Sequence, residues 1–216
     1  MVLPFSTGGS VESSPQLQKN IAHTRIIQFT NFMTEQESAE SPDPQPQSGK
    51  LLILVRHAKS SWDAPQLDDF ARPLNTRGFR DAPDMGKRLA AKYPKLDHFA
   101  SSPAVRAWTT AEILADAWNF PHEKLQPEPT AYEASTATLI DLVRKFPSDA
   151  TTAALAAHNP GITLTFNLLA GTHIANVPTC GVAILRFPVD SWPEVSEGEG
   201  VLVEYDFPKN SPGLGR

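Results

Sequence analysis

Residues 51–63 read LLILVRHAKSSWD, and this stretch decides the fold. The five apolar residues 51–55 are typical of a short strand that is buried on both faces of a parallel sheet. Arg56 and His57 follow the run directly. Because ligands bind outside the carboxyl ends of strands in open α/β sheets, we expect these two side chains to lie where a site forms.

Outward from this strand, the chain alternates between helical and extended patterns. Helices are predicted over 76–93, 103–119 and 137–146 and again after Pro160, and strands over 96–102, 152–157, 181–187 and 200–207. The late strands are expected to include an edge of the sheet. Pro83 and Gly86 are expected to kink or restart the first helix, and Pro103 is expected in the first turn of the second. The alternation predicts an α/β fold of three layers, α/β/α, with a mostly parallel sheet.

The chain has the length of one domain plus a tail, 216 residues. Residues 34–50, TEQESAESPDPQPQSGK, are acidic and then rich in Pro, Gln and Ser, with little to bury. We therefore expect a disordered N-terminal extension or linker over 1–49, the α/β domain over 50–208 and a flexible C-terminal tail over 209–216. A transit peptide and a true start at Met33 are the alternatives for the first residues.

Charge and composition exclude several classes of function. The chain carries 19 Lys and Arg against 24 Asp and Glu, a net charge of -5, which argues against nucleic acid or an anionic membrane as partner. Its one cysteine excludes an internal disulfide framework and a cysteine zinc cluster. The apolar runs fall far short of the roughly 20 residues of a membrane span. We expect a cytoplasmic protein.

The pattern of a strand followed by a basic residue recurs twice. In ASSPAVRAWTTA (100–111), Arg106 lies in the first turn of a helix, where free N–H groups and the helix dipole favour an anion. In AALAAHNPGI (153–162), the apolar run ends at His158. Such junctions share one edge of a parallel sheet, so Arg56, His57, Arg106 and His158 are expected together. Adjacent cations repel unless an anion joins them, and phosphate is the anion that suits a bidentate guanidinium.

These segments together resemble the histidine phosphatase superfamily, and most of all its SixA-like branch of phosphohistidine phosphatases. The resemblance is carried by LVRHAKSSWD (54–63), DFARPLNTRGFRDAPDMGKRL (69–89), SSPAVRAWTTAE (101–112) and AAHNPGI (156–162), and it spans about 51–208. It implies a phosphoglycerate mutase-like architecture. It also implies that His57 is the nucleophile, and that Arg56, Arg106 and His158 neutralise the equatorial phosphate oxygens.

The resemblance further implies hydrolysis through a phosphohistidine intermediate without a metal or other cofactor. The expected substrate is a phosphohistidine-bearing protein, because only 52 positions separate Arg106 from His158 and leave little room for a lid. The alternatives are a small phosphorylated substrate, for a phosphomonoesterase or mutase of the same superfamily, and a non-catalytic reader of phosphorylated ligands.

Four further positions carry weaker predictions. Ser60 is expected to touch phosphate. Asp63 departs from the superfamily pattern, in which Asn stands there, and is expected to orient Arg56 or another cation. Arg72 either extends the basic rim or forms an ion pair within its loop. Glu133 is the candidate donor of the leaving-group proton, with a solvated turn charge as the alternative.

One rival motif uses a different nucleophile. CGVAILR (180–186) has the C-x5-R spacing of cysteine-dependent tyrosine phosphatases. A phosphate cradle of that kind needs a Gly-rich loop, whereas residues 182–185 are apolar and indicate a buried strand. Cys180 is therefore predicted to be a small buried side chain.

Overall fold

The computed structural model describes residues 49–210. The extension predicted over 1–49, with Met33, lies outside the described residues apart from Gly49. Most of the tail predicted over 209–216 lies outside them too. Within residues 49–210, no helix combines the length and the apolar character that crossing a bilayer requires.

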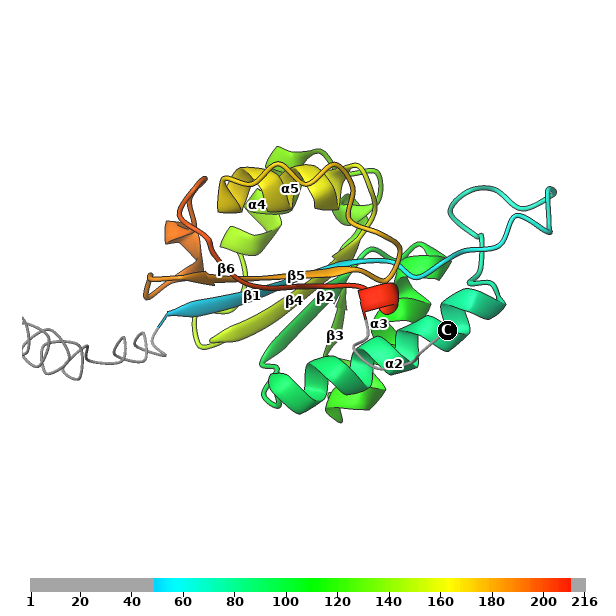
Figure 1. Cartoon of the computed structure of the whole chain (residues 1–216), viewed down its shortest axis with the longest axis horizontal. Coiled ribbons are helices and arrows are strands. Elements are labelled where there is room, and N and C mark those ends of the chain that lie inside the picture. Colours follow the sequence, from blue (N-terminus) through cyan, green and yellow to red (C-terminus); the bar gives the residue numbers. More distant parts are fainter. Residues whose placement is uncertain (1–48, 211–216) are drawn as a thin grey trace, which may run out of the picture. The chain divides into compact units, whose positions relative to one another are not determined.

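The described residues form a six-stranded sheet of order β3-β2-β4-β1-β5-β6 (Figure 1). Its central strand β1 pairs in parallel with β4, which pairs in parallel with β2, and β2 in parallel with β3. The last two strands are antiparallel, and β6 forms an edge. The bounds are β1 Lys50–Arg56, β2 His98–Ser101, β3 Leu125–Pro127, β4 Thr152–Ala157, β5 Val182–Phe187 and β6 Val201–Asp206. The mostly parallel sheet is thus confirmed.

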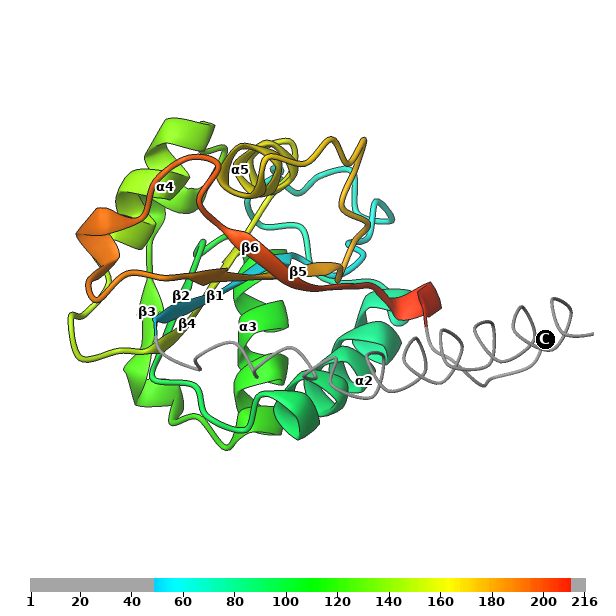
Figure 2. The same cartoon turned by 60° about the vertical axis from the view of Figure 1, so that its left-hand side comes forward.

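Helices cover both faces of the sheet. They are α2 Thr76–Lys92, α3 Val105–Trp118, α4 Thr136–Arg144 and α5 Gly161–Ala170. The pair α2 and α3 lies against one face and α4 and α5 against the other (Figures 1 and 2). Side chains of β1 alternate between the two resulting cores: Leu52 and Leu54 pack under α4 and α5, and Leu51, Ile53 and Val55 pack under α2 and α3. This double burial explains the unbroken apolar run, and the three-layer α/β/α fold is confirmed.

Two local predictions need correction, and one strand was missed. The restart predicted in the first helix is wrong, since α2 runs without a break through Pro83 and Gly86. Packing against α3 explains the glycine, because a Cβ on Gly86 would lie 2.8 Å from the Cβ of Ala117. Pro103 does not lie in the first turn of α3, since Ala104 is the N-cap and the proline precedes it. The short edge strand β3 was not predicted at all.

Candidate active site

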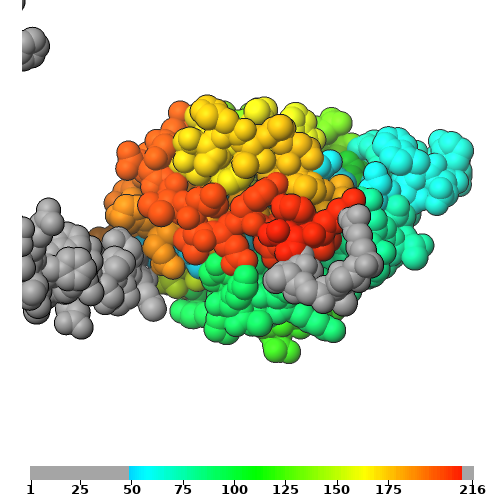
Figure 3. All heavy atoms as spheres, viewed as in Figure 1, coloured from blue at the N-terminus to red at the C-terminus, as the bar shows by residue number. Residues whose placement is uncertain are grey.

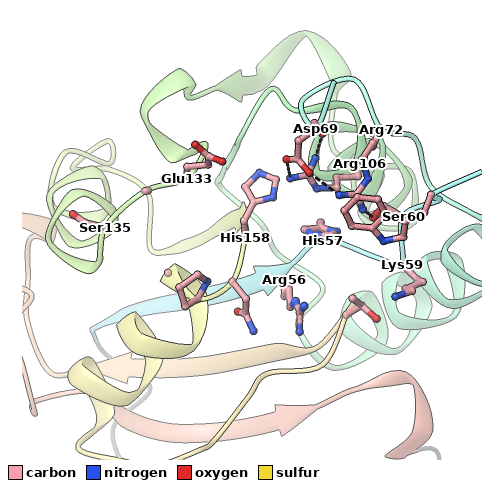
Figure 4. A pocket seen from close by; sticks show the side chains of 16 residues that line it. Arg56, His57, Lys59, Ser60, Asp69, Arg72, Arg106, Glu133, Ser135 and His158 are labelled. Atoms are coloured by element: carbon pink, nitrogen blue, oxygen red, sulfur yellow. Dashed lines mark hydrogen bonds and ion pairs between the residues drawn. The ribbon is translucent and has the colours of Figure 1, made fainter. Parts of the chain in front are cut away.

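The carboxyl ends of the parallel strands bring the predicted residues to one cavity. Arg56 at the end of β1 pairs with Ala157 at the end of β4, and Ser101 of β2 pairs with Ala156. The cavity at this edge has a volume of about 680 Å³ (Figure 4). All the predicted site residues line it: Arg56, His57, Ser60, Arg72, Arg106, Glu133 and His158.

His57 is held in one tautomer at the floor of this cavity. The ring is buried, with 9% of the residue exposed. Its Nδ1 lies 2.7 Å from the carbonyl oxygen of Ala58. Because a carbonyl only accepts hydrogen bonds, Nδ1 carries the proton and Nε2 keeps a free lone pair. The pKa of His57 is lowered to about 3, first by burial and then by the positive charges around it, so the ring is neutral at pH 7.

His158 faces His57 across a ring-to-ring distance of 5.1 Å. Its Nε2 lies 2.8 Å from the hydroxyl of Ser102, a buried residue directly after β2 that sequence reasoning missed. The Ser102 hydroxyl oxygen also accepts from the backbone N–H of Ala104. When the Ser102 hydroxyl donates its own hydrogen to Nε2, that nitrogen is an acceptor. The remaining proton of the neutral ring then lies on Nδ1. Burial, followed by the charge of Arg106, lowers the pKa of His158 to about 4.

Arg56 is anchored at its tip, and its Nε has no partner among the described residues. Its Nη1 donates to the carbonyl of Val177 at 2.6 Å and to the side chain of Asn176 at 3.1 Å. Within residues 49–210, neither Arg56 Nε nor His158 Nδ1 has a hydrogen-bond partner, although both atoms are buried. An unsatisfied buried donor costs about 1–3 kcal/mol, and a bound anion that accepted from these atoms would remove that cost.

Arg106 is clamped by an acidic residue that the sequence analysis did not single out. Arg106 Nη2 lies 2.7 Å from the carboxylate of Asp69, and Nη1 donates to the Asp69 backbone carbonyl. The same carboxylate accepts from Arg72 at 2.6 Å and from the hydroxyl of Tyr132 at 2.9 Å. Burial alone would raise the pKa of Asp69, but the bonds from Tyr132, Arg106 and Arg72 and the charge of Arg106 outweigh it and lower the pKa. Asp69 is therefore a carboxylate at neutral pH.

Arg72 satisfies both of its predicted alternatives, because it lines the cavity and forms the loop ion pair with Asp69. Its Nη2 donates to the hydroxyl of Ser60, and its guanidinium lies 3.3 Å from the ring centroid of Trp62. The Ser60 hydroxyl is thus already bound to Arg72 at the cavity wall.

The two remaining carboxylates stand apart from this cluster. Asp63 is exposed, accepts from the hydroxyl of Ser61 at 2.7 Å and makes no ion pair with a described cation. Its predicted role as an orienter of Arg56 is wrong, because Asn176 and Val177 hold that arginine instead. Glu133 is exposed at the rim, away from the Asp69 cluster (Figure 4).

Cys180 cannot serve as the nucleophile of a cysteine phosphatase. Its residue is 1% exposed, and its backbone N–H donates to the carbonyls of Arg56 and His57. Burial, with a smaller contribution from Asp81, raises the pKa of its thiol to about 12. Residues 182–186 belong to β5 rather than to a phosphate loop. The predicted small buried side chain is confirmed.

The charge of the lining suits a phosphate group. Four cationic side chains, from Arg56, Lys59, Arg72 and Arg106, line the cavity against the two carboxylates of Asp69 and Glu133. Among residues 49–210, no group of three or more His, Cys, Asp or Glu side chains is placed to hold a metal ion.

Comparison with known proteins agrees with this geometry. The model of the histidine phosphatase superfamily (branch 1) matches residues 52–128. An uncharacterized protein of Mycobacterium tuberculosis is 31% identical over 166 residues, which cover 72% of this chain and 100% of that protein. An uncharacterized chloroplastic protein of Arabidopsis thaliana is 31% identical over 161 residues, 70% of this chain and 72% of that protein.

Among solved structures, the protein histidine phosphatase SixA complexed with tungstate superposes with a TM-score of 0.61 at 21% identity, over 74% of this chain and 98% of SixA. That likeness shows a shared fold. With the family model and the relatives in sequence, it establishes that the chain belongs to the histidine phosphatase superfamily and has a SixA-like fold.

Proposed function

We propose that this protein is a phosphatase that transfers a phosphoryl group from its substrate to His57 and then to water. The observation that carries the proposal is a neutral His57 whose Nε2 lone pair is free, in a cavity lined by arginines. Family membership supports phosphatase chemistry, and the neutral ring supports a histidine nucleophile.

The first step forms a bond between His57 Nε2 and phosphorus, while the bond from phosphorus to the leaving group breaks and its electron pair departs with that group. The Nδ1–H bond to Ala58 stabilises the positive ring that results. Arg56 Nε and His158 Nδ1, together with Arg106, donate to the equatorial oxygens, where charge gathers in a loose transition state.

The second step is attack of water on the phosphorus of the phosphohistidine, and both protons of the water stay on the released phosphate, which leaves as dihydrogen phosphate. The electron pair of the nitrogen–phosphorus bond returns to Nε2, so His57 leaves as a neutral ring that needs no proton donor. The burial that lowers the pKa of His57 favours that neutral ring over the charged one and therefore favours this step.

The substrate we propose is phosphohistidine on a protein. Its leaving group is an imidazole, which takes up a proton on its second nitrogen near its ordinary pKa of about 6.5. Such a leaving group needs little help from a general acid of the enzyme. The cavity fits that requirement, because Asp69 is held as a carboxylate and is no acid. Transfer between two imidazoles also exchanges one nitrogen–phosphorus bond for another.

A phosphomonoesterase for small alcohol esters is the second candidate. An alkoxide leaving group needs a proton donor, and Glu133 at the cavity rim is the described residue that favours this alternative.

The test compares donors on the full-length protein. Values of kcat/KM are measured for a phosphohistidine-bearing protein, phosphoserine, phosphotyrosine and sugar phosphates, with His57→Gln as the inactive control. We expect phosphohistidine to be preferred by at least about tenfold, which corresponds to about 1.4 kcal/mol. Preference for a sugar phosphate, with activity lost in Glu133→Gln, supports the second candidate. Stoichiometric binding without turnover indicates a reader of phosphorylated ligands.

A further inference from the structure

An exposed apolar patch flanks the cavity on the segment between β1 and α2. This segment, coloured cyan, stands out from the body of the domain (Figures 1 and 3). Three of its large apolar side chains are exposed, Trp62 at 71%, Leu67 at 38% and Phe70 at 39%. Trp62 is the most exposed large hydrophobic residue of the described chain. We call these three residues the rim patch.

The rim patch is attached to the walls of the cavity. Trp62 lines the cavity and stacks on the guanidinium of Arg72, whose other bonds go to Asp69, Ser60 and Ser61. The ring of Phe70 meets that of Tyr132 edge-on at 5.1 Å. Tyr132 in turn lies 5.5 Å from the ring of His158. Trp62 is therefore linked to the cavity wall through Arg72, and Phe70 is linked to His158 through Tyr132.

We infer that the rim patch is the docking surface for the protein that carries the phosphohistidine. The inference rests on the proposed function and deepens it. A histidine has one methylene between its ring and its backbone, and His57 is 9% exposed. For a phosphohistidine to reach His57 Nε2, the backbone of the carrier must come to the mouth of the cavity. The surface of the carrier then covers the edge of that mouth, where Trp62 stands.

The composition of the patch suits such a contact. Tryptophan and other aromatic residues are enriched at the energetically important centres of protein interfaces, and exposed apolar patches with polar rims mark interaction sites. The exposed carboxylates of Asp63 and Asp68 lie on the same segment. The partner expected here presents apolar side chains beside its phosphohistidine, with Lys or Arg at the periphery.

A matched control lies elsewhere on the domain. Val201 of β6 is 61% exposed, close to the exposure of Trp62. It pairs with Arg186, which pairs with Leu51 at the amino end of β1. The cavity is at the carboxyl end of β1, so Val201→Ser removes an exposed apolar side chain, smaller than that of Trp62, at the other end of the sheet.

The experiment uses the full chain and three donors: phosphoramidate, a histidine-containing phosphocarrier protein phosphorylated on histidine, and a short peptide with the same phosphohistidine. Values of kcat/KM are measured for wild type, the double variant Trp62→Ala/Leu67→Ser and Val201→Ser. For the double variant we expect the ratio of the protein value to the phosphoramidate value to fall at least tenfold. The ratio of peptide to phosphoramidate is expected to stay within threefold, and Val201→Ser is expected to match wild type on all donors.

A smaller fall in the protein ratio, or an equal loss on all three donors, overturns the docking surface while leaving the proposed function standing. An equal loss would mean that Trp62 acts only through Arg72 and the cavity. If wild type hydrolyses phosphoesters but neither phosphohistidine donor, the proposed function fails, and the docking surface fails with it.

Discussion

The burial of His57 and His158 predicts a loss of stability at mildly acidic pH. Their pKa values in the folded protein are about 3 and about 4, against about 6.5 in an unfolded chain. As the pH falls below about 6.5, the unfolded chain therefore takes up a proton on each ring before the folded protein does. Proton binding by the unfolded state lowers stability, so the free energy of unfolding falls in this window.

The magnitude follows from the two pKa values. One pKa unit corresponds to about 1.4 kcal/mol, so at pH 5 each ring contributes a loss of about 2 kcal/mol relative to pH 7. The pair contributes about 4 kcal/mol, because both rings remain largely neutral in the folded protein at pH 5. Carboxylates contribute little above pH 5, since their ordinary pKa values lie near 4.

The assay is urea unfolding in phosphate-free buffer at pH 7 and pH 5. Wild type is compared with His57→Gln, with His158→Gln and with the double variant, and His173→Gln serves as a control in which an exposed ring is replaced. Between pH 7 and pH 5, the free energy of unfolding of wild type is expected to fall by about 4 kcal/mol more than that of the double variant. For each single variant, the fall is expected to be about 2 kcal/mol smaller than for wild type. Equal losses in wild type and double variant would show that the rings protonate normally inside the fold, and the argument for a neutral nucleophile would be refuted.

Three further variants test the site and its support. Arg106→Ala is expected to lower kcat/KM by about 10²-fold or more, as the loss of one electrostatic donor does elsewhere, and a drop below about tenfold contradicts its role. Asp69→Asn removes a carboxylate that contacts Arg106 and repels an anion bound beside it, so the Ki of vanadate should fall roughly tenfold. An unchanged or higher Ki contradicts this repulsion. In Gly78→Ala, the new Cβ would lie 2.4 Å from the carbonyl oxygen of Lys59. Urea unfolding should show a loss of about 1–3 kcal/mol, and unchanged stability would refute the contact.

The fold was predictable where it depends on local hydrophobic pattern. The apolar run of β1 and the pattern that ends at His158 are visible in single segments, and parallel pairing then forces their carboxyl ends to one edge. The place of Gly86 inside α2 was not predictable in this way, because the glycine allows a close approach to Ala117 of another helix. The strand β3 escaped prediction because it has three residues, of which only Leu125 is buried.

The site residues too were predictable where they follow a local pattern, and their long-range contacts were not. The four predicted residues were placed correctly at one cavity, because each lies at a junction that follows a strand: Arg56 and His57 at the end of β1, Arg106 in the first turn of α3 after β2, and His158 directly after β4. The contact of Asp69 with Arg106 joins residues 37 positions apart and has no local pattern. The actual holders of Arg56 are also far from it in sequence, which is why Asp63 was given a role that Asn176 and Val177 fill.

The proposed phosphoryl transfer to His57 can be observed by rapid-quench labelling. The full-length protein is mixed with a protein that carries [³²P]phosphohistidine, stopped in alkali within the first turnover and mapped by peptide analysis. We expect an acid-labile label on His57 that appears and decays at rates compatible with turnover, and no label in His57→Gln. Turnover without label on His57, or full turnover by His57→Gln, would contradict the proposed transfer.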